Sequence, residues 1–300
     1  MANKYIKTIL AFAVTSFVHP FAKKNPLGAF YRIARWQIIS RLKLENIETW
    51  IDGIKVKCRS GDTGFTGNLY YGLMEFEDMS FVMHLLDSED TFIDVGSNLG
   101  SYSLISGGVC KSKTYSLEPS KITYDRLVEN INLNNLTNVN CFNIGAGEKT
   151  GKVLFTTSKG PENHIITSPN LDTKDAVSVD IKKLDELFIE AEPTFMKIDT
   201  EGVELSVLRG ATKILESDKM IGLLVEINGN SERYNEADSD ILNLLLDLSY
   251  FPYHYNPLNR ELIKLDSYEK KGNTLFIKNL EEASNKIKLE KNNTIWGYNV

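Results

Sequence analysis

The sequence predicts an α/β fold with a mostly parallel sheet and helices on both faces. The apolar run Thr91–Val95 leads into a glycine-containing turn, Gly96-Ser-Asn-Leu-Gly100, and then into a helical pattern. A second apolar run, Thr114–Leu117, ends in Glu118. Strand-like and helix-like segments continue to alternate after it, and such alternation requires parallel strands joined by right-handed crossovers.

Each further element is predicted from the spacing of its apolar residues. Short apolar or alternating runs indicate strands, and a period of about 3.6 residues indicates helices. We expect strands at 91–95, 114–117, 139–144, 151–157, 177–181, 195–198, 221–225, 250–255 and 273–278, the last two as an antiparallel pair. We expect helices at 27–44, 79–86, 98–106, 122–134, 184–188, 203–215 and 238–248. The segment 151–188 interrupts the parallel rhythm, so it is expected over the mouth of a ligand crevice.

Length and composition fit one large domain with additions. The chain has 300 residues, of which 42% are apolar, and this is enough for a substantial core. We expect a basic helical extension at 1–60, a catalytic domain at 61–280 and a C-terminal tail at 281–300, with a linker around 59–67. The three cysteines are odd in number and form no Cys-x-x-Cys pair; they are Cys58, Cys110 and Cys141. They indicate thiols in a reducing, cytoplasmic compartment and argue against zinc.

Charge is distributed unevenly along the chain. The net charge is −6, but residues 1–44 carry eight basic and no acidic side chains, which leaves −14 on the remaining 256 residues. The apolar run 9–18 is too short to span a bilayer, although the apolar part of a signal peptide is an alternative interpretation.

The helix expected at 27–44 places Phe30, Ile33, Ala34 and Ile38 broadly on one side. Two interpretations of this apolar side are open. The helix packs on the catalytic domain or on a second subunit, or it lies on an anionic lipid surface.

The glycine turn and Glu118 together describe a nucleoside-binding crevice. Backbone N–H groups of the turn can approach a ligand closely, and a carboxylate at the end of the next strand can accept both hydroxyls of a ribose. A dinucleotide would require Gly-x-Gly-x-x-Gly, but no third glycine follows Gly100 until Gly107. Asp94, ahead of the turn, would repel a pyrophosphate and suits the ammonium group of a methionine. S-adenosylmethionine is therefore favoured over NAD.

Acidic residues end four of the expected strands, namely Asp94, Glu118, Asp199 and Glu226. Ligands of a doubly wound sheet sit beyond the carboxyl ends of its strands. Because carboxylates crowded at one sheet edge are costly without a compensating partner, this cluster indicates the site.

Several segments carry a resemblance to a known family. They are Asp94-Val-Gly-Ser-Asn-Leu-Gly100, Glu118-Pro119, Asn130-Ile-Asn-Leu-Asn134, Met196-Lys-Ile-Asp-Thr-Glu-Gly-Val-Glu-Leu205 and Val207-Leu-Arg-Gly-Ala211. With them the sequence resembles the FkbM family of S-adenosylmethionine-dependent methyltransferases, from about Tyr71 to Asn279. The resemblance implies a class I methyltransferase fold, Rossmann-like, with a seven-stranded sheet whose last strand is antiparallel. It also implies methyl transfer, usually to a hydroxyl.

The resemblance also implies roles for individual residues. The turn would hold the methionine part of the cofactor through Asp94, Gly96, Ser97, Asn98 and Gly100. Glu118 would hold the ribose, and Gly145 and Ala146 would flank the adenine. Asp199 and Glu201 would face the methyl group and the acceptor.

Two mechanisms remain open for removing the proton of an alcohol acceptor. Asp199 or Glu201 can act as the base directly, and His164, in a polar turn of the inserted segment, is a further candidate. Alternatively, Asp199, Glu201 and Glu226 can hold a divalent cation such as Mg²⁺, which lowers the pKa of the acceptor. His164 as a solvated loop residue is the competing interpretation, and His254 is a weaker candidate.

The predicted function is O-methylation of a sugar, glycan or glycolipid precursor, with the basic N-terminal segment near a membrane surface. A small natural product as acceptor, or a noncatalytic binding protein on this fold, are the alternatives. Nucleic acid is disfavoured as a partner because the body is acidic. Aromatic side chains are the expected sugar-stacking groups, with Tyr70, Tyr71, Phe76 and Tyr255 as candidates.

Overall fold

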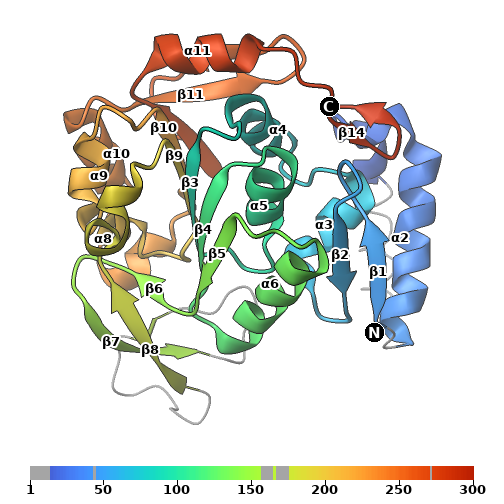
Figure 1. Cartoon of the computed structure of the whole chain (residues 1–300), viewed down its shortest axis with the longest axis horizontal. Helices are drawn as coiled ribbons and strands as arrows, with labels where there is room; N and C mark the ends of the chain where they lie inside the picture. The colour runs from blue at the N-terminus through green and yellow to red at the C-terminus, as the bar shows by residue number, and fades with distance from the viewer. Residues whose placement is uncertain (1–13, 43–44, 157–164, 167–175, 271) are drawn as a thin grey trace.

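The computed structural model describes residues 14–42, 45–156, 165–166, 176–270 and 272–300. An eight-stranded sheet forms its centre, with the strand order β5-β4-β3-β9-β10-β13-β11-β12 (Figure 1). The strands are β3 (Thr91–Val95), β4 (Lys113–Leu117), β5 (Val139–Phe142), β9 (Phe195–Ile198), β10 (Gly222–Glu226), β11 (Phe251–Asn256), β12 (Glu261–Lys264) and β13 (Asn273–Ile277). The predicted α/β class is confirmed. The strand β12 is an eighth that the sequence did not predict.

The direction of the strands decides where a ligand can sit. Strands β5, β4, β3, β9 and β10 are parallel, so their carboxyl ends meet at one edge. The pairing of Val95 with Leu117 and with Ile198 places the residues that follow β3, β4 and β9 beside one another. Strand β13 runs antiparallel, with Asn273 opposite Glu226, and pairs antiparallel with β11 as expected.

Helices cover both faces of the sheet. Neighbouring residues of a strand point to opposite faces, and apolar residues on each face pack against a separate layer of helices. Phe92 and Phe195 belong to one core, while Ile93 and Met196 belong to the other. The first face carries α4 (Phe76–Leu85), α5 (Ser101–Ser103), a π-helical turn (Leu104–Val109) and α6 (Lys121–Leu133). The second carries α7 (Leu184–Phe188), α8 (Glu204–Arg209), α9 (Thr212–Glu216) and α10 (Asp238–Asp247) (Figure 1).

A small second sheet belongs to the inserted segment. It consists of β6 (Gly145–Ala146), β7 (Gly151–Thr156) and β8 (Ala176–Lys182), with β8 in the middle. Strand β6 is parallel to β8 and β7 is antiparallel to it. The strands expected at 151–157 and 177–181 correspond to β7 and β8, and they pair with each other.

Elements from the first and last parts of the described chain lie side by side next to the main sheet (Figure 1). The N-terminal part contains α2 (Pro26–Arg41), β1 (Asn46–Thr49), β2 (Lys55–Cys58) and α3 (Thr63–Tyr71), and the C-terminal part α11 (Leu280–Lys288), β14 (Thr294–Ile295) and β15 (Tyr298–Asn299). The Arg32 guanidinium lies 3.6 Å from the centre of the Trp296 ring and donates to the carbonyl of Tyr70. The N-terminal helix is therefore packed on the domain.

Two expected elements differ from the structure. The linker around 59–67 is wrong, because α3 begins within it and buries Phe65 and Leu69. The helix expected at 203–215 is divided into α8 and α9 at Gly210. A Cβ at Gly210 would lie 2.2 Å from the carbonyl oxygen of Gly147, so a close backbone contact governs this position.

Candidate active site

The turn after β3 is shaped by left-handed backbone conformations. The φ angle is +80° at Gly96, +50° at Asn98 and +92° at Gly100. The N–H of Gly96 donates to the carbonyl of Leu117 at 3.0 Å. A Cβ at Gly96 would come within 1.8 Å of the carbonyl oxygen of Asp199. The glycine thus lets the end of β9 lie directly against the turn.

Glu118 connects this turn to the start of α6. One carboxylate oxygen accepts the N–H of Asn98 at 3.0 Å, and the other accepts the N–H of Ser120 at 2.8 Å. The side chain is buried, and this burial raises the pKa of Glu118 to about 7, although the two N–H donors oppose the shift. A carboxylate held in this way keeps lone pairs free for the hydroxyls of a ligand.

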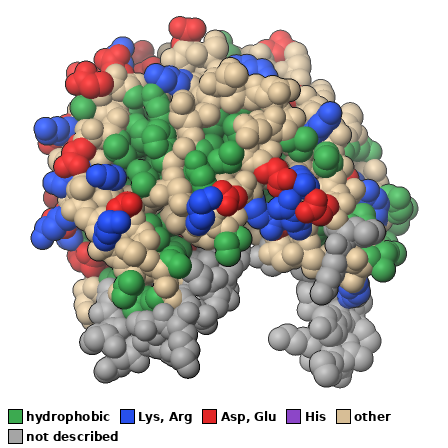
Figure 2. All heavy atoms as spheres, turned by 60° about the horizontal axis from the view of Figure 1, so that its bottom comes forward, with side chains coloured by type: hydrophobic (Ala, Val, Ile, Leu, Met, Phe, Trp, Pro, Cys, Tyr) green, Lys and Arg blue, Asp and Glu red, His purple; other side chains and the backbone are tan. Residues whose placement is uncertain are grey.

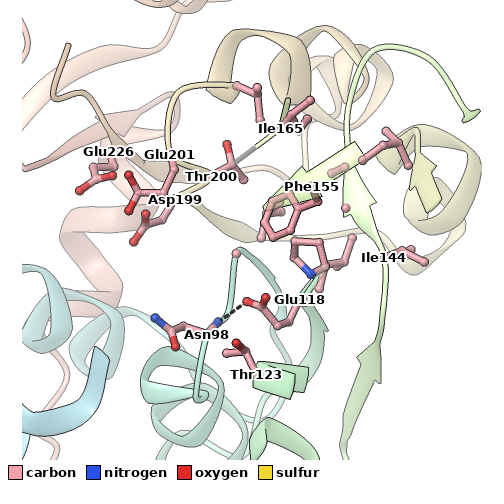
Figure 3. Close-up of a pocket in the computed structure, with 18 of the residues that line it drawn as sticks. Asn98, Glu118, Thr123, Ile144, Phe155, Ile165, Asp199, Thr200, Glu201 and Glu226 are labelled. Carbon is pink, nitrogen blue, oxygen red and sulfur yellow. Dashed lines mark hydrogen bonds between the residues drawn. The ribbon is translucent and has the colours of Figure 1, made fainter. Parts of the chain in front are cut away.

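A cavity of about 240 Å³ opens at this edge of the sheet (Figure 3). Three carboxylates gather at one end, three apolar side chains lie at the other, and Glu118 lies between them. The carboxylates belong to Asp199, Glu201 and Glu226, and the apolar side chains to Ile144, Phe155 and Ile165. The cavity therefore has an acidic end and an apolar end.

A buried lysine stands beside the acidic end. The ammonium group of Lys197 is 2.7 Å from a carboxylate oxygen of Asp199 and 4.8 Å from the centre of the Tyr102 ring. Burial lowers the pKa of Lys197, but the carboxylates of Asp199, Glu75 and Asp94 outweigh it and raise the pKa above its ordinary value. Lys197 is therefore charged, and its ammonium group forms an ion pair with Asp199.

Glu226 has the opposite character. Burial, together with the neighbouring charges of Asp199 and Glu201, raises the pKa of Glu226 to about 9. One of its carboxylate oxygens is buried without a hydrogen-bond partner among the described residues. At neutral pH, and with no cationic ligand present, Glu226 is consequently protonated.

The loop after β9 is held by hydrogen bonds to Glu204, at the start of α8, and from Asn230, which follows β10. Glu204 accepts the N–H of Thr200 at 2.9 Å and that of Gly202 at 3.1 Å. The side-chain amide of Asn230 donates to Glu201 at 2.9 Å. Glu201 itself has a φ of +60°, a conformation that an L-residue adopts only when its surroundings impose it.

The structure brings most of the predicted site residues together. Gly96, Asn98, Glu118, Gly145, Ala146, Asp199, Glu201 and Glu226 line the cavity. Asp94, Ser97 and Gly100 do not line it. Asp94 is buried behind the turn and accepts the hydroxyl of Ser103 at 2.6 Å, and burial raises the pKa of Asp94 to about 6. Asp94 supports the turn from behind, whereas Ser97 and Gly100 belong to the turn itself.

Of the two candidate histidines, His164 lies outside the described residues. His254 faces a second cavity, and its ring nitrogen is 4.0 Å from a carboxylate oxygen of Glu77. Two site residues were missed by the sequence reasoning, Lys197 and Phe155. The signal for Lys197 was available, because a lysine inside the apolar run Phe195–Ile198 has no reason to be buried without an acidic partner.

Three of the acidic side chains also have the spacing of a cation site. One oxygen each from Asp199, Glu201 and Glu226 lies within 4.8 Å of the others. Carboxylate oxygens are the ligands that Mg²⁺ prefers. Lys197 already supplies a positive charge to Asp199, however, so the cluster has a neutralising partner of its own.

The fold and the cavity together define the class I methyltransferase architecture, with its ligand space beyond the carboxyl ends of β3, β4, β9 and β10. The model of the FkbM methyltransferase domain matches residues 94–252, more than half of the chain. The chain belongs to this family.

Two curated relatives match part of the chain. The hexuronic acid methyltransferase AglP of Haloferax volcanii is 31% identical over 145 residues, which cover 47% of this chain and 57% of the relative. Methyltransferase 1 of Beauveria bassiana is 24% identical over 164 residues, which cover 47% of this chain and 61% of the relative. The matches thus span little more than half of these relatives' own length.

Solved structures give weaker likenesses. An rRNA methylase from Streptococcus thermophilus has a TM-score of 0.41 at 14% identity, with 68% of this chain and 95% of that chain covered. The TYW2 protein of M. jannaschii, in complex with AdoMet, has a TM-score of 0.40 at 13% identity, with 78% and 86% covered. The assignment of the chain rests on the family match and on its own strand order.

Proposed function

We propose that the protein is an O-methyltransferase that uses S-adenosylmethionine and methylates a hydroxyl of a sugar, glycan or glycolipid precursor. The cavity with one apolar and one acidic end carries the proposal. The apolar end suits an adenine ring, Glu118 suits ribose hydroxyls, and the acidic end suits a sulfonium cation. S-adenosylmethionine supplies the transferable methyl group. A relative named for hexuronic acid supports an acceptor of the sugar type.

We assign proton removal to Asp199. An alcohol has a pKa far above neutrality, so its proton must leave as the new bond forms. Asp199 is paired with the ammonium group of Lys197, whereas Glu226 carries a proton at neutral pH. The close approach of Gly96 fixes the backbone of Asp199 against the turn after β3, and this positions the carboxylate of Asp199. His164 remains the other candidate for the base.

Substitution of Asp199 tests this function. With purified full-length protein, S-adenosylmethionine and a panel of glycosides, we expect S-adenosylhomocysteine to form together with a methylated glycoside detected by mass spectrometry. Asp199→Asn should lower turnover on the order of 10²-fold or more while cofactor binding persists. The matched control is Asp218→Asn, an exposed aspartate at the other end of β10. Full activity of Asp199→Asn, with loss in His164→Ala, would transfer the role to His164.

A chelator separates the two mechanisms of proton removal. Direct catalysis by a carboxylate predicts unchanged turnover after divalent cations are removed with EDTA. Loss of turnover that Mg²⁺ restores would instead assign Asp199, Glu201 and Glu226 to a cation site. We favour direct catalysis because Lys197 already compensates the charge of Asp199.

The N-terminal part supports contact with a membrane surface. Seven large apolar side chains there are 61–76% exposed, namely Val14, Phe17, Val18, Leu27, Tyr31, Ile38 and Leu42. The eight basic residues of positions 1–44 match an anionic lipid surface. Among the described residues, no helix has the length and apolarity needed to cross a membrane.

In the part of the chain that the structure describes, the face shown in Figure 2 carries no concentrated basic footprint for nucleic acid. Figure 2 shows basic and acidic side chains interspersed over the face that it presents, with apolar patches between them. Phosphate-binding surfaces concentrate Lys and Arg on one face or stripe. We therefore expect no nucleic acid partner and a cytoplasmic protein that associates with the membrane from one side.

A further inference from the structure

A second cavity, of about 500 Å³, adjoins the candidate active site. It is built from the start of α4, the end of β11 and the start of β13. Glu75 lines both cavities. Asn273 of the second cavity is opposite Glu226 of the first in the strand register. The second cavity therefore begins where the acidic end of the first one stops, which is where a methyl acceptor has to lie.

The walls of the second cavity carry many hydrogen-bond acceptors. Four carboxylates line it, from Glu75, Glu77, Asp78 and Glu269. The amide nitrogen of Asn273 donates to Asp78 at 3.0 Å, while the amide oxygen of Asn273 is buried without a partner among the described residues. The hydroxyl of Tyr102 donates to Glu75 at 2.5 Å. Unused acceptor oxygens of this kind recognise hydroxyl or ammonium donors.

Aromatic groups form much of the rest of the wall, together with His19, Pro20, Met74, Gly272 and Leu275. Tyr253, His254 and Tyr255 come from β11, and Phe76 comes from α4. Aromatic edges beside polar acceptors suit the mixed apolar and hydroxyl surface of a sugar ring. Of the predicted stacking residues, Phe76 and Tyr255 line this cavity, whereas Tyr70 and Tyr71 are buried and do not.

The described walls of both cavities contain no lysine or arginine. The ammonium group of Lys197, the nearest strong cation described above, is already bound to Asp199. A ligand carboxylate placed here would face several protein carboxylates without a lysine or arginine to pair with. Of the two histidines in the wall, His254 already lies 4.0 Å from the carboxylates of both Glu77 and Glu269, so a further carboxylate is disfavoured by like charge. The cavity consequently discriminates against acidic sugars.

We propose that the second cavity is the acceptor subsite and that it takes a sugar ring without an acidic substituent, either a neutral sugar or an amino sugar. This inference rests on the proposed methyltransferase function. The inferred acceptor differs from the acidic sugar in the name of the hexuronic acid methyltransferase that this chain resembles.

Three matched acceptors test the inference: a glucoside, a glucosaminide and a glucuronide with the same aglycone. We expect kcat/KM for the glucoside or the glucosaminide to exceed that for the glucuronide by roughly tenfold or more. Binding of each acceptor to the protein loaded with S-adenosylhomocysteine, followed by ligand-observed NMR, should rank the compounds in the same order. This second readout does not depend on turnover.

A double variant locates the discrimination in the cavity. The side chains of Glu77 and Glu269 are 49% and 47% exposed, so Glu77→Gln with Glu269→Gln should preserve the fold. We expect the double variant to reduce the ratio of kcat/KM for the glucoside or glucosaminide to that for the glucuronide, mainly by lowering KM for the glucuronide. Binding of S-adenosylhomocysteine should be unchanged. Glu261→Gln, an exposed glutamate on neighbouring β12, is the control and should keep the preference.

Each contrary result has a distinct meaning. Preferred binding and methylation of the glucuronide, or an unchanged preference in the double variant, overturns the inference and leaves the methyltransferase function standing. Failure to bind S-adenosylhomocysteine, together with no methylation of any acceptor, overturns the proposed function and the inference with it.

Discussion

Glu118 shows how one residue can organise a ligand site. Its two oxygens bind the N–H groups of Asn98 and Ser120, so the carboxylate joins the glycine turn to the start of α6. It was predicted from sequence because it ends a strand 18 positions after the turn. The ionised form accepts hydrogen bonds with both oxygens, whereas the protonated form has lost part of that capacity.

We expect Glu118→Gln to weaken S-adenosylhomocysteine binding roughly tenfold to a hundredfold, because a charge-assisted acceptor is replaced by a neutral one. In the wild type, affinity should fall as pH drops through about 7, the value to which burial raises the pKa of Glu118. Isothermal titration calorimetry from pH 6 to pH 8 measures both effects. The exposed Glu216→Gln variant is the control, and an unchanged pH profile in Glu118→Gln would contradict the assignment.

Residue types at strand ends could be predicted, but their orientation could not. Asp94 and Asp199 both follow or end buried strands, yet one supports the turn from behind and the other lines the cavity. The difference arises from the direction in which each side chain leaves its strand. For Lys197, the sequence signals that a buried lysine needs an acidic partner, but only the structure identifies that partner as Asp199, at 2.7 Å.

At the scale of elements, strongly periodic segments were predicted well and short or glycine-rich ones poorly. The strand at 91–95 and the helix at 184–188 match β3 and α7 residue for residue. The sequence did not predict the hairpin of β1 and β2. It predicted a linker where α3 begins, because Gly61, Gly64 and Gly67 are typical of loops. Tertiary packing of Phe65 and Leu69 overrides that local preference.

Helix α2 packs on the domain, which was one of the two sequence interpretations. It buries Ala29, Ile33 and Trp36 against the domain, which confirms packing on the domain. The expected apolar side was wrong in one respect, because Ile33 is buried while Phe30 and Ile38 are exposed. The helix therefore has a second apolar stripe that faces away from the protein.

This stripe leads to a prediction about lipid. The triple variant Leu27→Gln, Tyr31→Gln and Ile38→Gln should reduce sedimentation with vesicles that contain anionic phospholipid several-fold, because it removes exposed apolar side chains. The fold should persist, because the buried side of α2 is unchanged. High salt should also weaken sedimentation of the wild type by screening the basic residues. Ile122→Gln with Leu258→Gln, whose side chains are 68% and 69% exposed elsewhere on the molecule, is the matched control. Dissociation of a dimer by the triple variant, with unchanged sedimentation, would assign the stripe to a second copy.

At the scale of the whole molecule, buried carboxyl groups concentrate around the two cavities. Burial is the main cause that raises the pKa of Asp78 to about 7, of Glu118 to about 7 and of Glu226 to about 9. In the folded protein without a ligand, these three carboxyl groups therefore lie where the protonated, neutral form is favoured. A cationic ligand relieves this cost, which links the stability of the fold to occupancy of the site.

The same groups predict how stability depends on pH. The ordinary pKa values of these carboxyls are 3.8 and 4.5, so the unfolded chain has lost their protons by pH 7, while the native chain still binds protons at Glu226. The native state binds more protons, and the free energy of unfolding must fall as pH rises from 7 to about 9. His84, whose pKa burial lowers to about 4, acts with the opposite sign but only below its ordinary value of 6.5. Calorimetry should show Tm decreasing across this range. Glu226→Gln should remove much of the decrease in Tm above pH 7.5. The control Glu290→Gln, at an exposed position, should leave the decrease unchanged. A constant or rising Tm in the wild type would contradict a protonated Glu226.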